Sequence, residues 1–154
     1  MYNRILLPLD GSKLSECAIE HVRAIASGCN ASEVVLLSVV GSYEPGSGWS
    51  WGGVISESQM AETTRKAEEA AKKYLARVQK RLEKDGLTVD TEIMVGTPAD
   101  TILDYAKATG CDLIIMATHG RSGVSRWALG SVAERVLQLA STPVLIVSPK
   151  GCRV

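Results

Sequence analysis

The sequence predicts an α/β protein in which four helices cover a single-domain, doubly wound sheet of five parallel strands. Short, nearly continuous apolar runs, typical of strands buried on both faces, alternate along the chain with longer segments of helical periodicity. Glycine or proline marks most of the boundaries between these segments. The 154 residues, 45% of them hydrophobic, suffice for one sizeable core. Strands that alternate with helices imply right-handed crossovers, and hence helices on both faces of the sheet.

The N-terminal half supplies two strands and two helices. The expected strands are residues 4–9 and 33–40, and the expected helices are one ending at about Ser27 and one over residues 56–85. Asp10 and Ser12 can cap the first helix, because their side-chain oxygens accept hydrogen bonds from free amides at a helix start. Gly28 and Gly86 follow the two helices, where glycine commonly ends a helix.

The C-terminal half supplies three strands and two helices. The expected strands are residues 87–95, 113–117 and 143–147, and the expected helices are residues 98–109 and 131–140. Thr97 followed by Pro98 is a typical helix start, since proline suits the first helical position. Ser131 and Glu134 have the spacing of a capping box, which predicts another helix start.

The glycine-rich segment 117–131 predicts a phosphate-binding loop. It links an apolar strand to a helix, and it contains Gly120, Gly123 and Gly130. Backbone amides at a helix N-terminus attract anions, and glycine lets a ligand approach the backbone closely. In parallel sheets ligands bind beyond the carboxyl ends of the strands, where the strand order reverses. We therefore expect the site at that end of the sheet.

This segment resembles the nucleotide loop of the universal stress protein family, Gly-x2-Gly-x9-Gly-(Ser/Thr). The motif positions fall on Ala117, Gly120 and Gly130, followed by Ser131, so that alanine replaces the first glycine. A methyl group at Ala117 is harmless where φ is negative, but it could narrow the approach to a phosphate.

Three other segments resemble the same family, so that the likeness covers nearly the whole chain. They are residues 5–12, ILLPLDGS, residues 95–98, VGTP, and residues 142–147, TPVLIV. The resemblance implies the strand order 3-2-1-4-5 and an adenine nucleotide alpha hydrolase-like fold. It also implies a homodimer through the C-terminal strand, whose apolar edge would otherwise lack a partner.

The resemblance further implies that the chain binds an adenine nucleotide, ATP or AMP, and Mg²⁺ could accompany the phosphates. Asp10 would contact adenosine as well as cap a helix, and the backbone of Val39 would meet the adenine edge. Arg121 and Arg126 could neutralise phosphate charge or lie on a solvated loop face. The expected nucleotide-binding residues are Pro8, Leu9, Asp10, Gly11, Ser12, Val39, Met116, Ala117, Thr118, His119, Gly120, Arg121, Ser122, Gly123, Gly130, Ser131, Val132 and Ala133.

Composition and charge argue against several kinds of partner. Lys plus Arg and Asp plus Glu each number 17, so a net charge of zero offers no electrostatic reason to expect nucleic acid. No run reaches membrane-spanning length and no signal peptide is visible, so we expect a cytoplasmic protein without a membrane partner. The four cysteines, Cys17, Cys29, Cys111 and Cys152, show no CxxC or zinc spacing, and we expect free thiols.

We therefore expect a binding protein, with one nucleotide-binding domain over residues 1–150, a loop insert at 41–55 and a tail at 151–154. Nucleotide state could set loop conformation, and hence the choice of a protein partner in a stress response. Two alternatives stay open: slow ATP hydrolysis or phosphoryl transfer in the same cleft, although no catalytic set is visible, or a dimeric scaffold that binds no nucleotide. Trp49 and Trp51 could form a lid, contact a partner or pack on the long helix.

Overall fold

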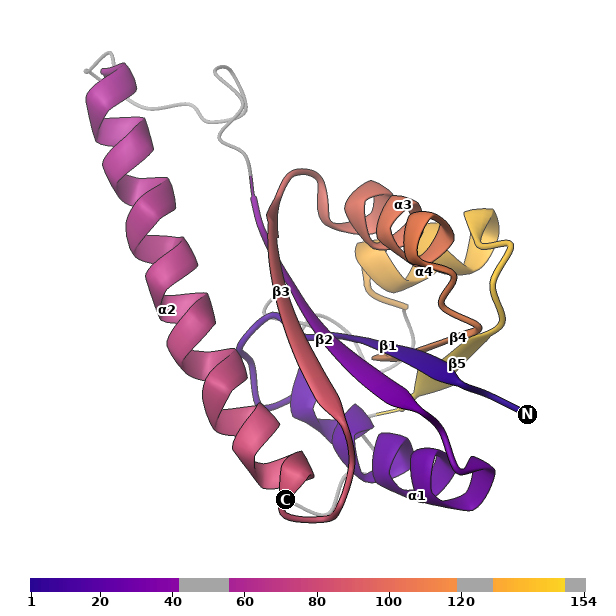
Figure 1. The fold of residues 1–154 in the computed structure, drawn as a ribbon. Helices are drawn as coiled ribbons and strands as arrows, with labels where there is room; N and C mark the ends of the chain where they lie inside the picture. The colour runs from indigo at the N-terminus through magenta and orange to yellow at the C-terminus, as the bar shows by residue number, and fades with distance from the viewer. Residues whose placement is uncertain (42–55, 119–128, 149–154) are drawn as a thin grey trace.

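The computed structural model describes residues 1–41, 56–118 and 129–148. Five parallel strands form one sheet in the order β3-β2-β1-β4-β5, which confirms the expected fold class and strand order (Figure 1). The strands are β1 (Arg4–Pro8), β2 (Glu33–Val40), β3 (Val89–Val95), β4 (Leu113–Ala117) and β5 (Val144–Val147). The tail at 151–154 and, apart from Gly41, the insert at 41–55 with Trp49 and Trp51 lie outside the described residues.

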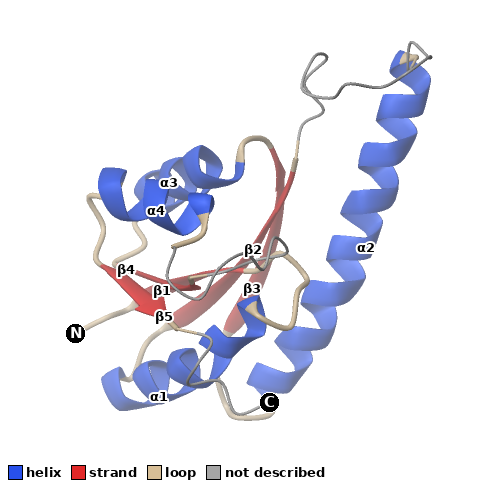
Figure 2. Ribbon diagram, turned by 180° about the vertical axis from the view of Figure 1, so that it is seen from behind, coloured by secondary structure: helices blue, strands red, loops and turns tan. Residues whose placement is uncertain are grey.

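Helices cover both faces of this sheet (Figure 2). A 3-10 turn, η1 (Ser15–Ala18), leads into α1 (Ile19–Cys29), and α1 packs with α2 (Glu57–Glu83) on one face. The opposite face carries α3 (Pro98–Thr109) and α4 (Ser131–Leu139). Within the described residues, no helix is both long enough and apolar enough to cross a bilayer.

Alternate side chains of each central strand enter two separate cores. Ile5 and Leu7 of β1 face the core under α1 and α2, whereas Leu6 faces the core under α3 and α4. All three side chains are fully buried, and each contributes roughly 1.5–3 kcal/mol of hydrophobic stabilisation. This burial on both faces explains why the strands read as continuous apolar runs rather than as alternating patterns.

The first helix differs from its prediction at its C-terminal end. Gly28 lies inside α1, and the helix ends at Asn30, which adopts the left-handed conformation with φ 54°. The amide of Ala31 then donates to the carbonyl of Ala26 at 2.9 Å, which satisfies a carbonyl of the last turn. Asparagine tolerates this conformation better than most residues, so it takes the role expected of glycine.

The cysteines also differ from their prediction. Cys29 and Cys111 are free thiols, as expected, but Cys17 is disulfide-bonded. Cys111 is buried, and this burial raises the pKa of its thiol above the ordinary value.

Helix α2 begins at the capping box of Ser56 and Gln59 and is held to the domain through its C-terminal half. Leu75, Val78 and Leu82 are buried against the sheet, and the N-terminal turns extend past the ends of β2 and β3 in Figure 1. Ion pairs to the α1 side complete the attachment. They are Arg81 with Glu16 at 2.9 Å and Arg23 with Asp85 at 2.7 Å.

Candidate functional site

The carboxyl ends of β1 and β4 separate at the point where the strand order reverses. The two strands pair only through Ile5 with Leu113 and Leu6 with Ile114. Beyond this point β1 pairs with β2 alone and β4 pairs with β5 alone, although both strands continue. In doubly wound proteins ligands bind in the crevice outside the carboxyl ends of two such strands, so the end of β1 and β4 is the candidate site.

One wall of this crevice is the turn that follows β1. The amide of Leu9 continues the sheet by donating to the carbonyl of Leu37 at 2.8 Å. The Oδ1 atom of Asp10 then accepts hydrogen bonds from the amide of Ser12 at 2.9 Å and from its hydroxyl at 2.6 Å. Gly11, with φ 81°, supplies the left-handed residue that this tight turn requires.

Ser12 also links the turn to the helix that follows. Its Oγ accepts the amide hydrogen of Ser15 at 3.1 Å, and the hydroxyl of Ser15 donates to the carbonyl of Ser12 at 2.8 Å. The predicted helix cap is wrong, because the N-cap residues of η1 and α1 are Leu14 and Ala18, and neither makes a side-chain cap. Asp10 and Ser12 instead form a hydrogen-bonded turn ahead of η1. This turn fixes the Asp10 carboxylate at the end of β1, where a ligand in the crevice would meet it.

The opposite wall joins the end of β4 to the start of α4. Thr118 donates its amide to the carbonyl of Val147 at 3.0 Å, and its own carbonyl accepts the amide of Gly130 at 2.7 Å. Ala117 is buried, and its φ is negative, since Asn30 is the only non-glycine residue with positive φ in the described ranges. The backbone at Ala117 therefore does not require the glycine of the family motif.

Helix α4 begins without a side-chain cap, which overturns the predicted capping box. Gly130 is the N-cap residue, with φ −61° and ψ 147°, and it makes no side-chain cap. Ser131 lies one residue inside the helix, so its hydroxyl is not placed to cap it. Glu134 is the first residue whose amide finds a helical acceptor, the carbonyl of Gly130 at 2.9 Å.

The amides of Ser131, Val132 and Ala133 consequently have no carbonyl within the helix to bond. They sit at the positive end of the helix dipole, beside the crevice, because the Thr118 to Gly130 hydrogen bond holds the helix start against the end of β4. An anion placed there would satisfy several of these amides together.

The remaining expected residues divide into two groups. The first group lies within the described residues, near the ends of the strands. Val39 is half-buried near the end of β2 and packs against the same core as buried Met116, and Pro8 is buried at the end of β1. The other group lies outside the described residues and comprises His119, Gly120, Arg121, Ser122, Gly123 and Arg126. The structure therefore brings together the two ends of the predicted loop.

Tyr74 of α2 is a polar residue near the turn after β1, and the sequence gives no signal that it lies there. Burial, followed by the nearby carboxylate of Glu16 and a weaker effect of Asp10, raises its pKa to about 12. Its hydroxyl is buried beside Ser15 and Glu16. Such a group is visible only once the fold brings α2 against the turn after β1.

The described residues contain no group of three or more His, Cys, Asp or Glu side chains that could hold a metal ion. Asp10 places a carboxylate at the crevice, and its Oδ1 is bonded to Ser12. If Mg²⁺ enters the site, the phosphates of a nucleotide would have to supply most of its oxygen ligands.

Comparison with known proteins places this architecture in a family. The family model described as "Universal stress protein family" matches residues 1–148. Universal stress protein MJ0531 of Methanocaldococcus jannaschii is 36% identical over 147 residues, which cover 96% of this chain and 82% of that protein. The solved structure of MJ0577 from the same organism superposes with a TM-score of 0.83 at 36% identity, and the match covers 96% of both chains.

A more distant structure shares the fold. The universal stress protein family protein of Arabidopsis thaliana, solved with AMP bound, has a TM-score of 0.66 at 16% identity and covers 95% of this chain and 91% of its own. The match of the family model over almost the whole sequence, together with relatives above 30% identity, is decisive. This chain belongs to the universal stress protein family.

Proposed function

We propose that the chain binds an adenine nucleotide, ATP or AMP, at the carboxyl end of its sheet, and acts through nucleotide-dependent conformation and partner binding. The observation that carries this proposal is the uncapped start of α4, held beside the point where β1 and β4 separate. Amides that a side chain does not cap are available to a phosphate, and the helix dipole favours its negative charge.

Other residues of the crevice fit the remaining parts of a nucleotide. The Ser131 hydroxyl is exposed at the first position of α4, where it could add a hydrogen bond to a phosphate oxygen. Asp10 is held by Ser12 and could accept hydrogen bonds from ribose hydroxyls. Half-buried Val39 lies where an adenine ring could cover apolar surface.

The fold itself accommodates such a ligand in at least one more distant case, the AMP-bound protein of Arabidopsis thaliana. That likeness concerns the fold alone, so the proposal depends on the residues of this chain. When bound, Mg²⁺ would neutralise part of the phosphate charge. The described residues include no Lys or Arg in the first turn of α4 that could take this role.

The proposal includes the cytoplasmic homodimer expected from the sequence. β5 is the edge strand of the sheet, and Val144, Leu145 and Ile146 are only half-buried within one chain. Isologous pairing of β5 with a second copy would satisfy its free backbone groups and bury these side chains. The opposite edge of the described sheet is β3, which is less apolar because it carries Asp90 and Glu92.

Two measurements test the nucleotide site. Mass spectrometry of the freshly purified protein should detect a bound adenine nucleotide, and calorimetry should give measurable affinity for ATP and AMP. Gly130→Val should weaken both affinities, because β-region φ and ψ tolerate valine while its side chain crowds the phosphate path. Gly28→Val is the matched control, since no atom outside its own helix lies within 4 Å of the added Cβ.

The outcomes also separate the alternatives. A folded protein with no nucleotide content and no affinity would contradict the proposal and favour the scaffold. Turnover of ATP with added Mg²⁺, measured as phosphate release and lost in Gly130→Val, would instead favour the enzyme.

A further inference from the structure

A stripe of cations runs along the solvent-facing side of α2. Lys73, Arg77, Lys80 and Lys84, here called the basic stripe, follow one another at intervals of four, three and four residues, which places them on one helix face. All four are exposed, and they line a shallow surface depression together with Ala76 and Arg81. The buried residues of the helix lie on the opposite face.

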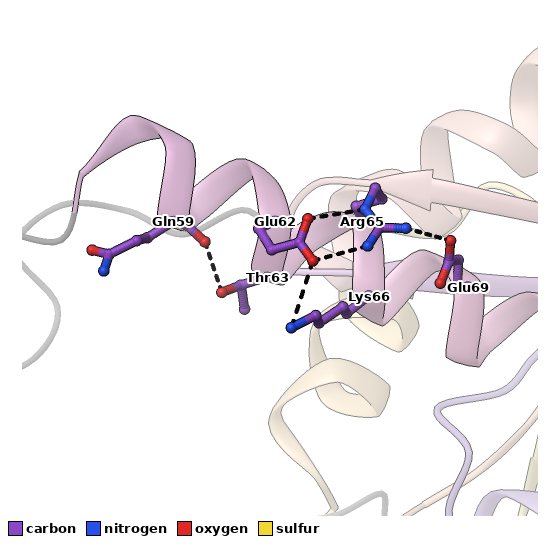
Figure 3. A network of polar contacts seen from close by, with 6 residues as sticks. All are labelled: Gln59, Glu62, Thr63, Arg65, Lys66 and Glu69. Carbon is purple, nitrogen blue, oxygen red and sulfur yellow. Dashed lines mark hydrogen bonds and ion pairs between the residues drawn. The ribbon is translucent and has the colours of Figure 1, made fainter.

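The basic stripe contrasts with the N-terminal half of the same helix, where the cations are paired (Figure 3). Arg65 bonds Glu62 at 2.8 Å and Glu69 at 2.5 Å, and Lys66 lies 3.5 Å from Glu62. In the part of the chain that the structure describes, no carboxylate forms an ion pair with any of the four stripe residues. Arg77 lies over the ring of Tyr74 at 5.4 Å, a contact that leaves its charge in place.

The acidic residues around the basic stripe are largely committed to other partners. Glu16 pairs with Arg81, Asp85 pairs with Arg23, and Glu69 pairs with Arg65 although it lies four residues before Lys73. Glu83 is exposed on the flank of the stripe. The four positive charges therefore remain available to a partner.

Helix stability does not account for this arrangement. Like charges three or four residues apart destabilise a helix by about 0.2–0.5 kcal/mol for each pair. Cations near a helix C-terminus are favourable, but only within the last turn, which Lys73 and Arg77 do not reach. Attachment of α2 to the domain uses Leu75, Val78 and Leu82 on the other face.

We propose that the basic stripe docks an acidic helical segment of a partner protein. With about 1.5 Å of rise per residue, its charges are spaced by about 6, 4.5 and 6 Å along the helix. Carboxylates that recur at the same intervals on a second helix would meet them in register, and the aliphatic stems around Ala76 would supply the contact between the two helices. Charge complementarity would select the partner.

Two other anionic partners fit less well. A membrane surface calls for large apolar side chains beside the cations, but the large hydrophobic residues exposed in the described ranges are Met1 and residues of β3, α4 and the segment before α4, with none on α2. A nucleic acid calls for a broad positive field, whereas this chain has a net charge of zero. Both stay as outcomes of the test.

The test uses the full chain and a synthetic alanine-rich peptide with glutamates at intervals of four, three and four residues. Amide chemical shifts of the labelled protein should map binding to α2, and fluorescence anisotropy should give the affinity. Lys73→Gln combined with Lys80→Gln should weaken binding at least about tenfold. Arg65→Gln combined with Lys66→Gln is the matched control, since it removes the same charge from paired positions and should change affinity less than twofold.

Three results would overturn the proposal. The first is equal binding of a peptide with the same composition but scrambled spacing. The second is an equal loss of affinity in the two double variants, which would indicate a nonspecific effect of net charge. The third is tighter binding of duplex DNA, or of vesicles rich in phosphatidylserine, than of the peptide at the same salt concentration. Because the stripe and the nucleotide site share no residue, nucleotide affinity should stay unchanged in both double variants.

Discussion

Replacing Ser131 with aspartate should separate the stability of α4 from its proposed phosphate binding. Ser131 is exposed at the first position of a helix that has no side-chain cap. A carboxylate there interacts favourably with the helix dipole, by about 0.3–1 kcal/mol. For a domain of this size, that gain should raise Tm by about 1–3 °C.

The same carboxylate should repel a bound phosphate. For two unit charges about 5 Å apart, Coulomb's law gives about 1 kcal/mol at an effective dielectric constant of about 80 and about 3 kcal/mol at about 20. Affinity for a nucleotide should therefore fall by about fivefold to more than a hundredfold. The loss should be larger for ATP than for AMP and negligible for adenosine, because the repulsion grows with phosphate charge.

Ser131→Asn is the control, because asparagine has nearly the shape of aspartate without its charge. Calorimetry with ATP, AMP and adenosine, together with thermal unfolding, measures both effects on the same samples. Equal nucleotide affinities in the aspartate and asparagine variants would refute a phosphate at the start of α4. A lower Tm in Ser131→Asp than in Ser131→Asn would refute the uncapped helix start on which the site depends.

The structure supports three further predictions. Gly96→Ala should destabilise the fold by about 1–3 kcal/mol in urea unfolding, because the new Cβ would lie 2.5 Å from Oγ1 of Thr101, and Thr101→Ala should relieve most of this loss. The difference in phenolate absorbance between wild type and Tyr74→Phe should titrate near pH 12 rather than 10. The contribution of Tyr74 to the free energy of unfolding should fall between these two pH values, because the folded state retains the proton that the unfolded state has lost. Leu145→Asp should convert a dimer to a monomer in light scattering, and a wild type that is monomeric at micromolar concentration would contradict the proposed pairing of β5.

The segments that the sequence predicts best are those whose own pattern is sufficient to define them. β2 and β4 match the predicted ranges, since each is a continuous apolar run that the sheet buries on both faces. Helix α3 also matches, because Pro98 favours its start and Gly110, with φ 67°, ends it. In these segments local preference and tertiary burial point to the same structure.

Predictions failed where two residues compete for one role. Gly28 and Asn30 both can end α1, and the choice depends on the hydrogen bond from the Ala31 amide to the Ala26 carbonyl in the folded chain.

The disulfide bond of Cys17 depends on which thiols the fold brings together, and four cysteines without a recognisable spacing do not reveal this. The convergence of the turn after β1 with the start of α4 likewise follows from strand order, which the resemblance supplied.

The error at Ser131 has a functional consequence, because two predictions made from the same residues exclude one another. A capping box would have used the Ser131 side chain to satisfy an amide of the first turn. A phosphate site needs those same amides to be free of protein acceptors. The structure places Gly130, which has no side chain, at the N-cap, so the capping box does not form.

A glycine cap costs the helix only a few tenths of a kcal/mol relative to serine or aspartate, so the free amides are retained at little expense in stability. The hydrogen bond from the Gly130 amide to the Thr118 carbonyl, at 2.7 Å, then fixes the direction of the helix start. It uses the amide of Gly130 and none of the three amides that follow. If the proposed phosphate binds at this helix start, which the backbone already positions in the described part of the chain, binding would require little rearrangement.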